Sequence, residues 1–504
     1  MVKSLLTCLI SILSINTYSF AGSILETKDF VLSMDTYLRK DLVSFKNVVD
    51  LDSANSDDTT TYFGIDYSFA FELEFNDQGP EFYIKMERNG PYDYDAPLFV
   101  HNTLMTSGGV IEGYRNDELL PNLEECWLDL PLSNGNRFKI GLYTYEVGNG
   151  FSLNGGFEEI GFTLYKKSDD LSWHLRYTRP DIHNKNHLGP RIRQDEEQGI
   201  DYEPGAVNFL SFDIKLESEK NSLQPYIGVL ADYTSSGKRD NQFSAPVERD
   251  ILGTVGFAWQ WEGDSLIFDF EAARNFGKAK SSSSEYEDIY HFGYLVYSGL
   301  EYNLKRFTPS IKCLIASGNK VPLDAALNQD ETLNSSRNRS FNYFSPLNNN
   351  LGDSVCSSNV DMLPIVAMGG GYGLNYGVPR PGTCAAGDFE NLIMPSIGIE
   401  FQLTKKLSFG AFGYYLSSFE KAVGTLNGEA KRLSRDLGEE IDIFIDYQLS
   451  QNVLISFLGG YFIPGRYYKE ARDDVDGSLF SPYLRGDQKA DNAYQIELAV
   501  EFQF

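Results

Sequence analysis

The stretch at residues 492–504, NAYQIELAVEFQF, decides the fold class of the chain. Large apolar side chains occupy every second position, and polar or small side chains occupy the positions between them. A β-strand points successive side chains to opposite faces, so this stretch has one apolar face and one polar face. The apolar face consists of Tyr494, Ile496, Leu498, Val500, Phe502 and Phe504.

The same alternation recurs along the chain and is clearest in residues 61–75. Large residues follow one another without a gap on one face of that stretch, while mostly small or acidic residues lie on the other. A soluble core rarely needs so long an apolar face on one strand, whereas a wall that faces lipid does. The large residues are Phe63, Ile65, Tyr67, Phe69, Phe71, Leu73 and Phe75.

Alternation of this kind predicts about eighteen strands along the chain. The segments that carry it begin shortly after the N-terminal segment and continue to the last residue. They are residues 29–41, 61–75, 81–88, 122–131, 137–147, 158–167, 171–179, 207–218, 223–233, 250–262, 265–276, 288–304, 307–317, 391–404, 407–418, 436–449, 452–463 and 492–504.

The links between these strands alternate in length. Every second link is short, as at residues 262–264 and 305–306, and the others are mostly long, as at 89–121 and 318–390. This alternation predicts an all-β fold, a transmembrane antiparallel up-and-down β-barrel with short periplasmic turns and long extracellular loops. An open edge in lipid would leave backbone groups unpaired, so the last strand must close on the first.

The N-terminus indicates export. Residues 1–21 read as a secretory signal peptide, with Lys3 ahead of a short apolar segment and small residues before Gly22. Residues 22–504 then form a single barrel domain, which we expect in the bacterial outer membrane. The net charge of −28 argues against a nucleic-acid partner, because phosphate binding needs a basic surface.

The side chains on the polar face of each strand are expected to line the lumen. Two interpretations of its charges remain open: a pore that selects its solute by charge, or paired charges that only solvate the inner wall. Acidic residues outnumber basic ones on this parity, which predicts a preference for cations. The candidate lining residues are Arg39, Asp66, Glu72, Glu74, Lys85, Asp129, Lys139, Arg176, Asp213, Lys215, Asp269, Glu271, Lys312, Glu400, Asp442, Glu497 and Glu501.

The longest link, residues 318–390, is a candidate functional loop. It could fold inward as a constriction of the pore, or lie across the mouth as a cap. Cys356 and Cys384 lie within it, and an exported compartment permits a disulfide between them. Two free thiols are the alternative.

No stretch of the chain carries a catalytic or metal-binding signature. His183 and His187 have the i, i+4 spacing of a zinc site but lack its Glu and lie in a predicted loop. Ser172 and His174 share the polar face of one strand, which fits a pair of lumen residues better than an active site. We therefore expect no enzymatic activity, no cofactor and no bound metal.

Three stretches carry a resemblance to a known family. They are residues 437–465, residues 127–150 and residues 341–347. On these stretches the chain resembles the alginate-export family of outer-membrane β-barrels. The resemblance implies an eighteen-stranded barrel that passes an uncharged or anionic polymer or small solute across the outer membrane. The family's alginate exporter has a pore rich in Arg and Lys, whereas the inward positions here are mostly acidic, and a negative wall repels a polyanion.

These observations predict a passive outer-membrane channel for a polysaccharide or a small hydrophilic solute. The alternative is a surface adhesin or structural barrel whose lumen is blocked by residues 318–390. Expected partners are outer-membrane lipid and lipopolysaccharide, and the barrel-assembly machinery, which would engage the C-terminal strand that ends in Phe504.

Overall fold

The structure is a computed structural model, and it describes fourteen parts of the chain. These are residues 22–46, 60–75, 79–88, 122–155, 160–168, 170–179, 207–233, 247–281, 287–320, 337–339, 391–421, 423–426, 429–470 and 490–503. The predicted signal peptide, Cys356, Cys384, Phe504 and most of the 318–390 link lie outside these residues.

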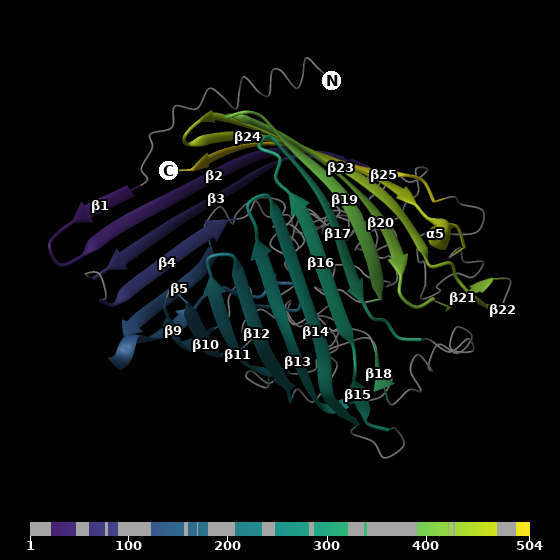
Figure 1. Cartoon of the computed structure of the whole chain (residues 1–504), viewed down its shortest axis with the longest axis horizontal. Helices are drawn as coiled ribbons and strands as arrows, with labels where there is room; N and C mark the ends of the chain where they lie inside the picture. The colour runs from purple at the N-terminus through teal and green to yellow at the C-terminus, as the bar shows by residue number, and fades with distance from the viewer. Residues whose placement is uncertain are drawn as a thin grey trace, which may run out of the picture.

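The described strands form a closed antiparallel β-barrel (Figure 1). Each wall strand pairs with the wall strands before and after it in the chain, as an up-and-down barrel requires. In the described residues the eighteen wall strands are β2 (Val31–Lys46), β3 (Thr60–Glu74), β4 (Glu81–Arg88), β5 (Asn122–Pro131), β6 (Asn136–Leu142), β9 (Ile160–Lys167), β10 (Leu171–Arg179), β11 (Val207–Ser218), β12 (Asn221–Asp232), β13 (Val247–Glu262), β14 (Leu266–Ser281), β16 (Tyr294–Tyr302), β17 (Phe307–Ala316), β19 (Leu392–Thr404), β20 (Leu407–Ser418), β23 (Asp436–Ser450), β24 (Val453–Pro464) and β25 (Ala493–Gln503).

The barrel closes between β2 and β25. The two strands pair in antiparallel register from Tyr37 opposite Gln503 to Lys46 opposite Tyr494. On the outward parity of this seam, Val500 and Phe502 are buried and pack against an apolar set from β2 and β24, consisting of Leu38, Val453 and Ile455. The predicted closure of the last strand on the first is confirmed.

Every predicted strand overlaps a wall strand, but two were predicted too long. The strand expected at 137–147 leaves the wall after Leu142, and Tyr145–Val147 (β7) pairs instead with Leu153–Gly155 (β8). The strand expected at 288–304 is broken into Ile289–His291 (β15) and β16. The carbonyl of Gly293, in this break, accepts a hydrogen bond from Asn275 N–H at 2.7 Å. Alternation predicts extended backbone correctly in both places, but it does not show which neighbour the strand pairs with.

Small elements complete the ends of the barrel. At the end with the short turns, β1 (Gly22–Glu26) pairs with the start of β2. At the opposite end lie β18 (Arg337–Asn338), the hairpin of β21 (Val423–Leu426) and β22 (Glu429–Arg432), and the short helix α5 (Arg466–Glu470). No helix among the described residues is long and apolar enough to cross a membrane.

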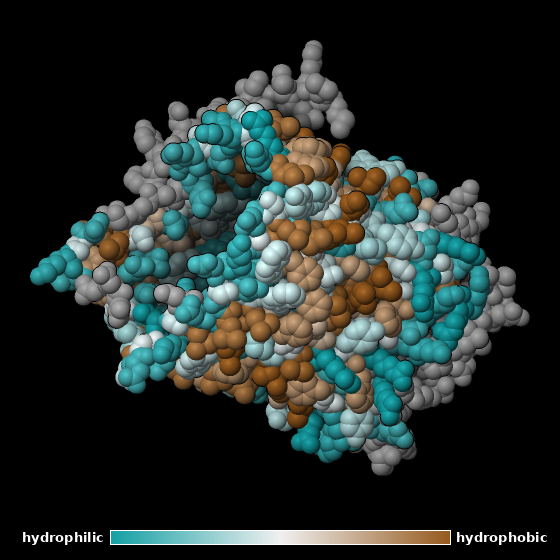
Figure 2. All heavy atoms as spheres, viewed as in Figure 1, coloured by the Kyte–Doolittle hydropathy of each residue, from teal (hydrophilic) through white to brown (hydrophobic). Residues whose placement is uncertain are grey.

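The outer face of the barrel is apolar. Figure 2 shows hydrophobic side chains gathered over the strands that face the viewer, with hydrophilic ones toward their ends. Neighbouring side chains on the inner parity are buried and often charged. A lipid environment rather than water suits such an exterior. Large exposed apolar residues of this face include Leu210, Phe212, Ile227, Val255, Phe257, Trp259, Ile311, Ile397, Ile441 and Ile443.

An Ile443→Arg substitution tests this assignment of the outer face. Ile443 lies near the middle of β23, points outward and is 37% exposed. We expect the substitution to lower the free energy of unfolding in lipid vesicles by about 2–4 kcal/mol, because arginine is costly at the bilayer midplane. Leu449→Arg, on the same face beside a short turn, is the matched control and should cost about 1 kcal/mol or less. Equal costs at both positions would contradict a lipid-facing wall.

Candidate channel lumen and its inserted ribbon

The structure places the predicted lumen residues on the inner parity of the wall. Several are almost fully buried, which shows that the lumen is not lined by freely hydrated charges alone. The side chain of Asp66 is outside the described residues, and Glu74 is exposed at the end of β3. The buried ones are Asp129, Arg176, Asp213, Glu271, Lys312, Asp442 and Glu497, and the half-buried ones are Arg39, Glu72, Lys85, Lys139, Lys215, Asp269, Glu400 and Glu501.

A segment between β6 and β9 folds into the barrel, and we call residues 143–155 the inserted ribbon. It consists of β7, a turn and β8, and three of its apolar side chains, Val147, Phe151 and Leu153, have no exposed surface. These side chains pack on the inner face of the wall strands. The segment therefore occupies part of the lumen, where the sequence had suggested residues 318–390 for such a constriction.

Contacts made by aromatic residues hold the ribbon against the wall. The Tyr143 hydroxyl lies 2.7 Å from Thr163 Oγ1 on β9. Tyr145 stacks on Phe209 of β11, with ring centroids 6.2 Å apart. Further along, Phe151 packs against Tyr297 of β16 at 4.4 Å. The ribbon thus crosses the inside of the barrel from β9 to β16.

A buried carboxylate on β14 anchors the middle of the ribbon. Glu271 has no exposed surface, and its Oε1 accepts hydrogen bonds from Ser152 Oγ and from the Tyr226 hydroxyl, each at 2.7 Å. Its Oε2 accepts the backbone N–H of Asn149 at 2.8 Å. Three donors from the ribbon and from β12 therefore converge on one side chain.

Gly148 allows the backbone of the ribbon to lie close to Glu271 and the wall. Its φ of +68° lies in the left-handed region, which glycine adopts without steric cost. A Cβ at this position would meet Ala258 Cβ at 3.0 Å and Glu271 Oε2 at 3.1 Å. The Gly148 N–H also donates to Gln224 Oε1 at 3.2 Å. The turn of the ribbon can therefore pack against the wall only because residue 148 has no side chain.

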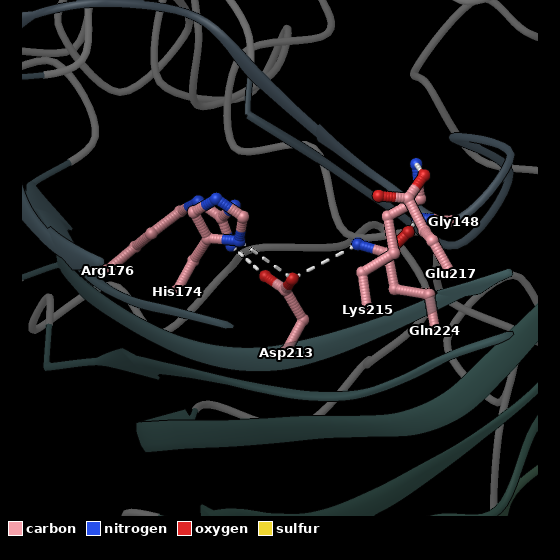
Figure 3. Close-up of polar contacts among 7 residues, drawn as sticks. All are labelled: Gly148, His174, Arg176, Asp213, Lys215, Glu217 and Gln224. Atoms are coloured by element: carbon pink, nitrogen blue, oxygen red, sulfur yellow. Dashed lines mark hydrogen bonds and ion pairs between the residues drawn. The ribbon is translucent and has the colours of Figure 1, made fainter. Parts of the chain in front are cut away.

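A charged network beside the ribbon centres on Asp213 of β11 (Figure 3). Asp213 is 1% exposed and forms an ion pair with Arg176 of β10. His174 Nδ1 lies 3.0 Å from Asp213 Oδ2, and Gln224 Nε2 donates to the same oxygen at 3.1 Å. The guanidinium of Arg176 also lies 5.1 Å from the ring centre of Tyr145 in the ribbon. The predicted residues Arg176 and Asp213 are thus brought together, and both are joined to the ribbon.

A second network lies near the short turns. Arg137 Nε donates to Asp129 Oδ1 at 3.0 Å, and its Nη2 donates to Glu81 Oε1 at 2.9 Å. The Tyr165 hydroxyl donates to the other oxygen of Asp129. Beside it, Lys139 Nζ lies 3.6 Å from the ring centre of Trp127. The predicted residue Asp129 is therefore neutralised largely by Arg137, which is not among the predicted lining residues.

Other predicted charges are paired across or along strands. Arg39 of β2 bridges Glu497 and Glu501 of β25 at the closing seam. Lys312 Nζ lies 2.8 Å from Glu301 Oε1 of the adjacent strand. Two further pairs join residues two apart on one strand, Lys85 with Glu87 and Lys215 with Glu217. Each of these predicted residues thus has a partner of opposite charge on the same or the adjacent strand.

Sequence reasoning missed the ribbon's functional residues. Alternation alone places Glu146 in a wall strand, and Asn149 and Ser152 in the link that follows it. Gly148 and Gly150 interrupt the alternation here, and both adopt positive φ. That glycine pair was the available signal that the strand ends and the chain turns.

Comparison with known proteins identifies the family. A family model described as alginate export matches residues 190–481, more than half of the chain. No curated protein is a significant sequence match. The crystal structure of the outer membrane protein OprD from Pseudomonas aeruginosa has 11% identity and a TM-score of 0.49, covering 97% of this chain and 98% of that one. The structure of OccK11 (OpdR) from the same organism has 10% identity and a TM-score of 0.48, covering 97% and 99%. By the family model and its closed barrel, the chain belongs to the alginate export family and is a channel protein of the bacterial outer membrane.

Proposed function

We propose that the chain is a passive channel for small hydrophilic solutes and that it favours cations and uncharged molecules over anions. The observation that carries this proposal is the sign of the charges on the inner wall. Carboxylates outnumber cations on the described inner wall even though Asp129, Asp213 and Glu497 are each paired with an arginine, because Glu72, Asp269, Glu271, Glu400 and Asp442 also lie on this parity. A wall with this balance repels anions and attracts cations.

The inserted ribbon supports small solutes rather than a bulky polymer. It is held to the inside of the wall by hydrogen bonds to Glu271 and by aromatic packing, so it is a fixed part of the lumen. A polyuronate such as alginate would meet both the ribbon and a wall of its own charge. Alginate is therefore not the substrate that we propose, although the family is described by its export.

Current measurements in planar bilayers test the proposal. With a gradient of potassium chloride across the membrane, the reversal potential should show that potassium permeates several times better than chloride. In liposome swelling, galactose should enter faster than galacturonate, which has nearly the same size but carries a negative charge. A reversal potential of the opposite sign, or faster entry of galacturonate, would overturn the preference. Membranes that stay closed at all voltages would overturn the channel itself.

A further inference from the structure

The inserted ribbon has two faces, and one carboxylate lies on the face that points away from the wall. Tyr145 stacks on the wall residue Phe209, and Val147 has no exposed surface. Glu146 lies between them in β7, and its side chain is exposed. Because successive residues of a strand point to opposite faces, Glu146 points away from the wall, toward the interior of the barrel.

The surroundings of Glu146 differ from those of the wall charges. Among the residues that the structure describes, no cation forms an ion pair with Glu146, whereas Asp213, Asp129 and Glu497 each do with an arginine. The side chain lies over Gly150, which has no side chain of its own to cover it. Enclosure by the barrel raises the pKa of the Glu146 carboxyl above its usual value through desolvation. The group is thus enclosed by protein and still open to the lumen.

An unpaired carboxylate acts on a passing ion in a way that a paired one does not. In an ion pair, the fields of the two charges largely cancel a few ångströms away. A single carboxylate in a narrow, poorly screened passage keeps its full attraction for cations and its full repulsion of anions. One such group on the narrowing segment can dominate the selectivity of the whole lumen.

We propose that Glu146 is the residue that determines the charge selectivity of the channel, by binding permeating monovalent cations and primary ammonium groups as they pass the ribbon. This inference rests on the proposed function, because it assigns the preference for cations to one side chain. It also explains why the many wall carboxylates need not contribute equally. Those that are paired hold the wall together, and Glu146 meets the solute.

The test compares Glu146→Gln with Glu217→Gln in reversal-potential measurements. Each substitution removes one negative charge from the lumen, but Glu217 is a wall carboxylate paired with Lys215 at 2.6 Å. We expect Glu146→Gln to lower the ratio of potassium to chloride permeability several-fold, toward one, and Glu217→Gln to change it less than twofold. Glu146→Asp should keep most of the selectivity, since it keeps the charge.

The outcomes separate this inference from the proposed function. If the wild-type channel is not cation-selective, the proposed function fails and the assignment of Glu146 fails with it. If the wild type is cation-selective and Glu146→Gln leaves the ratio unchanged, or both substitutions lower it equally, only the assignment of Glu146 is overturned. Single-channel conductance serves as the structural check, because loss of the ribbon from the wall would raise it strongly, whereas the loss of one charge would not.

Discussion

A Glu271→Ala channel is expected to conduct several times more current per molecule than the wild type. Glu271 accepts hydrogen bonds from Ser152 Oγ, the Tyr226 hydroxyl and Asn149 N–H, and all of them are made in a site without solvent exposure. Truncation leaves the Asn149 N–H and one of the two hydroxyls without an acceptor, since the Ser152 and Tyr226 hydroxyls also hydrogen-bond each other. Each unsatisfied buried donor costs about 1–3 kcal/mol. Detachment of the ribbon from the wall then becomes more favourable, because its freed N–H and hydroxyl groups can hydrogen-bond to water. The lumen widens as a result. Single-channel recording in planar bilayers measures the change.

Glu271→Gln is the matched control for that experiment. Glutamine keeps the size of the side chain and one acceptor oxygen, so the ribbon should remain attached and the conductance should stay close to that of the wild type. A Glu271→Ala channel with unaltered conductance would show that packing of Phe151 and Leu153 holds the ribbon without the carboxylate. That result would contradict the role of Glu271 as the anchor.

The second large effect is expected on stability. Asp213→Ala should lower the free energy of unfolding by about 3–5 kcal/mol, the usual cost of leaving a buried charge without its partner. The side chain of Arg176 is 6% exposed and forms its ion pair with Asp213, so the substitution leaves a guanidinium in a site that water barely reaches. Denaturant titration of the barrel in lipid vesicles measures the loss.

The control for Asp213→Ala lies two residues further along the same strand face. Lys215 pairs with Glu217, and their side chains are 37% and 39% exposed. An exposed pair of this kind contributes about 1 kcal/mol or less, so Lys215→Ala should leave the unfolding free energy nearly unchanged. A comparable loss in both variants would mean that burial does not set the strength of the Asp213 network.

The wall could be predicted from the sequence because lipid imposes a local rule. A strand that faces hydrocarbon must place an apolar residue at every second position over its whole length, as in residues 61–75. The rule holds at each strand independently, so it needs no knowledge of the neighbours. The order of strands then follows from the alternation of short and long links, and closure follows from the cost of an open edge.

The ribbon could not be predicted in the same way because its position depends on distant partners. Asn149 and its acceptor Glu271 are 122 residues apart in the chain. Residues 145–147 alternate like a wall strand, and nothing in their own sequence shows that they pair with 153–155 instead. The pairing of charges in the lumen is unpredictable for the same reason. Parity shows that Asp129 faces inward, but it does not show that Arg137 is its partner.

The ribbon also makes the two halves of the circumference unequal. It lies flat against the inside from β9 to β16, tied at Thr163 at one end and at Tyr297 at the other. The described inner surface is therefore asymmetric, because the ribbon overlies the wall between β9 and β16 and brings Glu146 inward from that side alone.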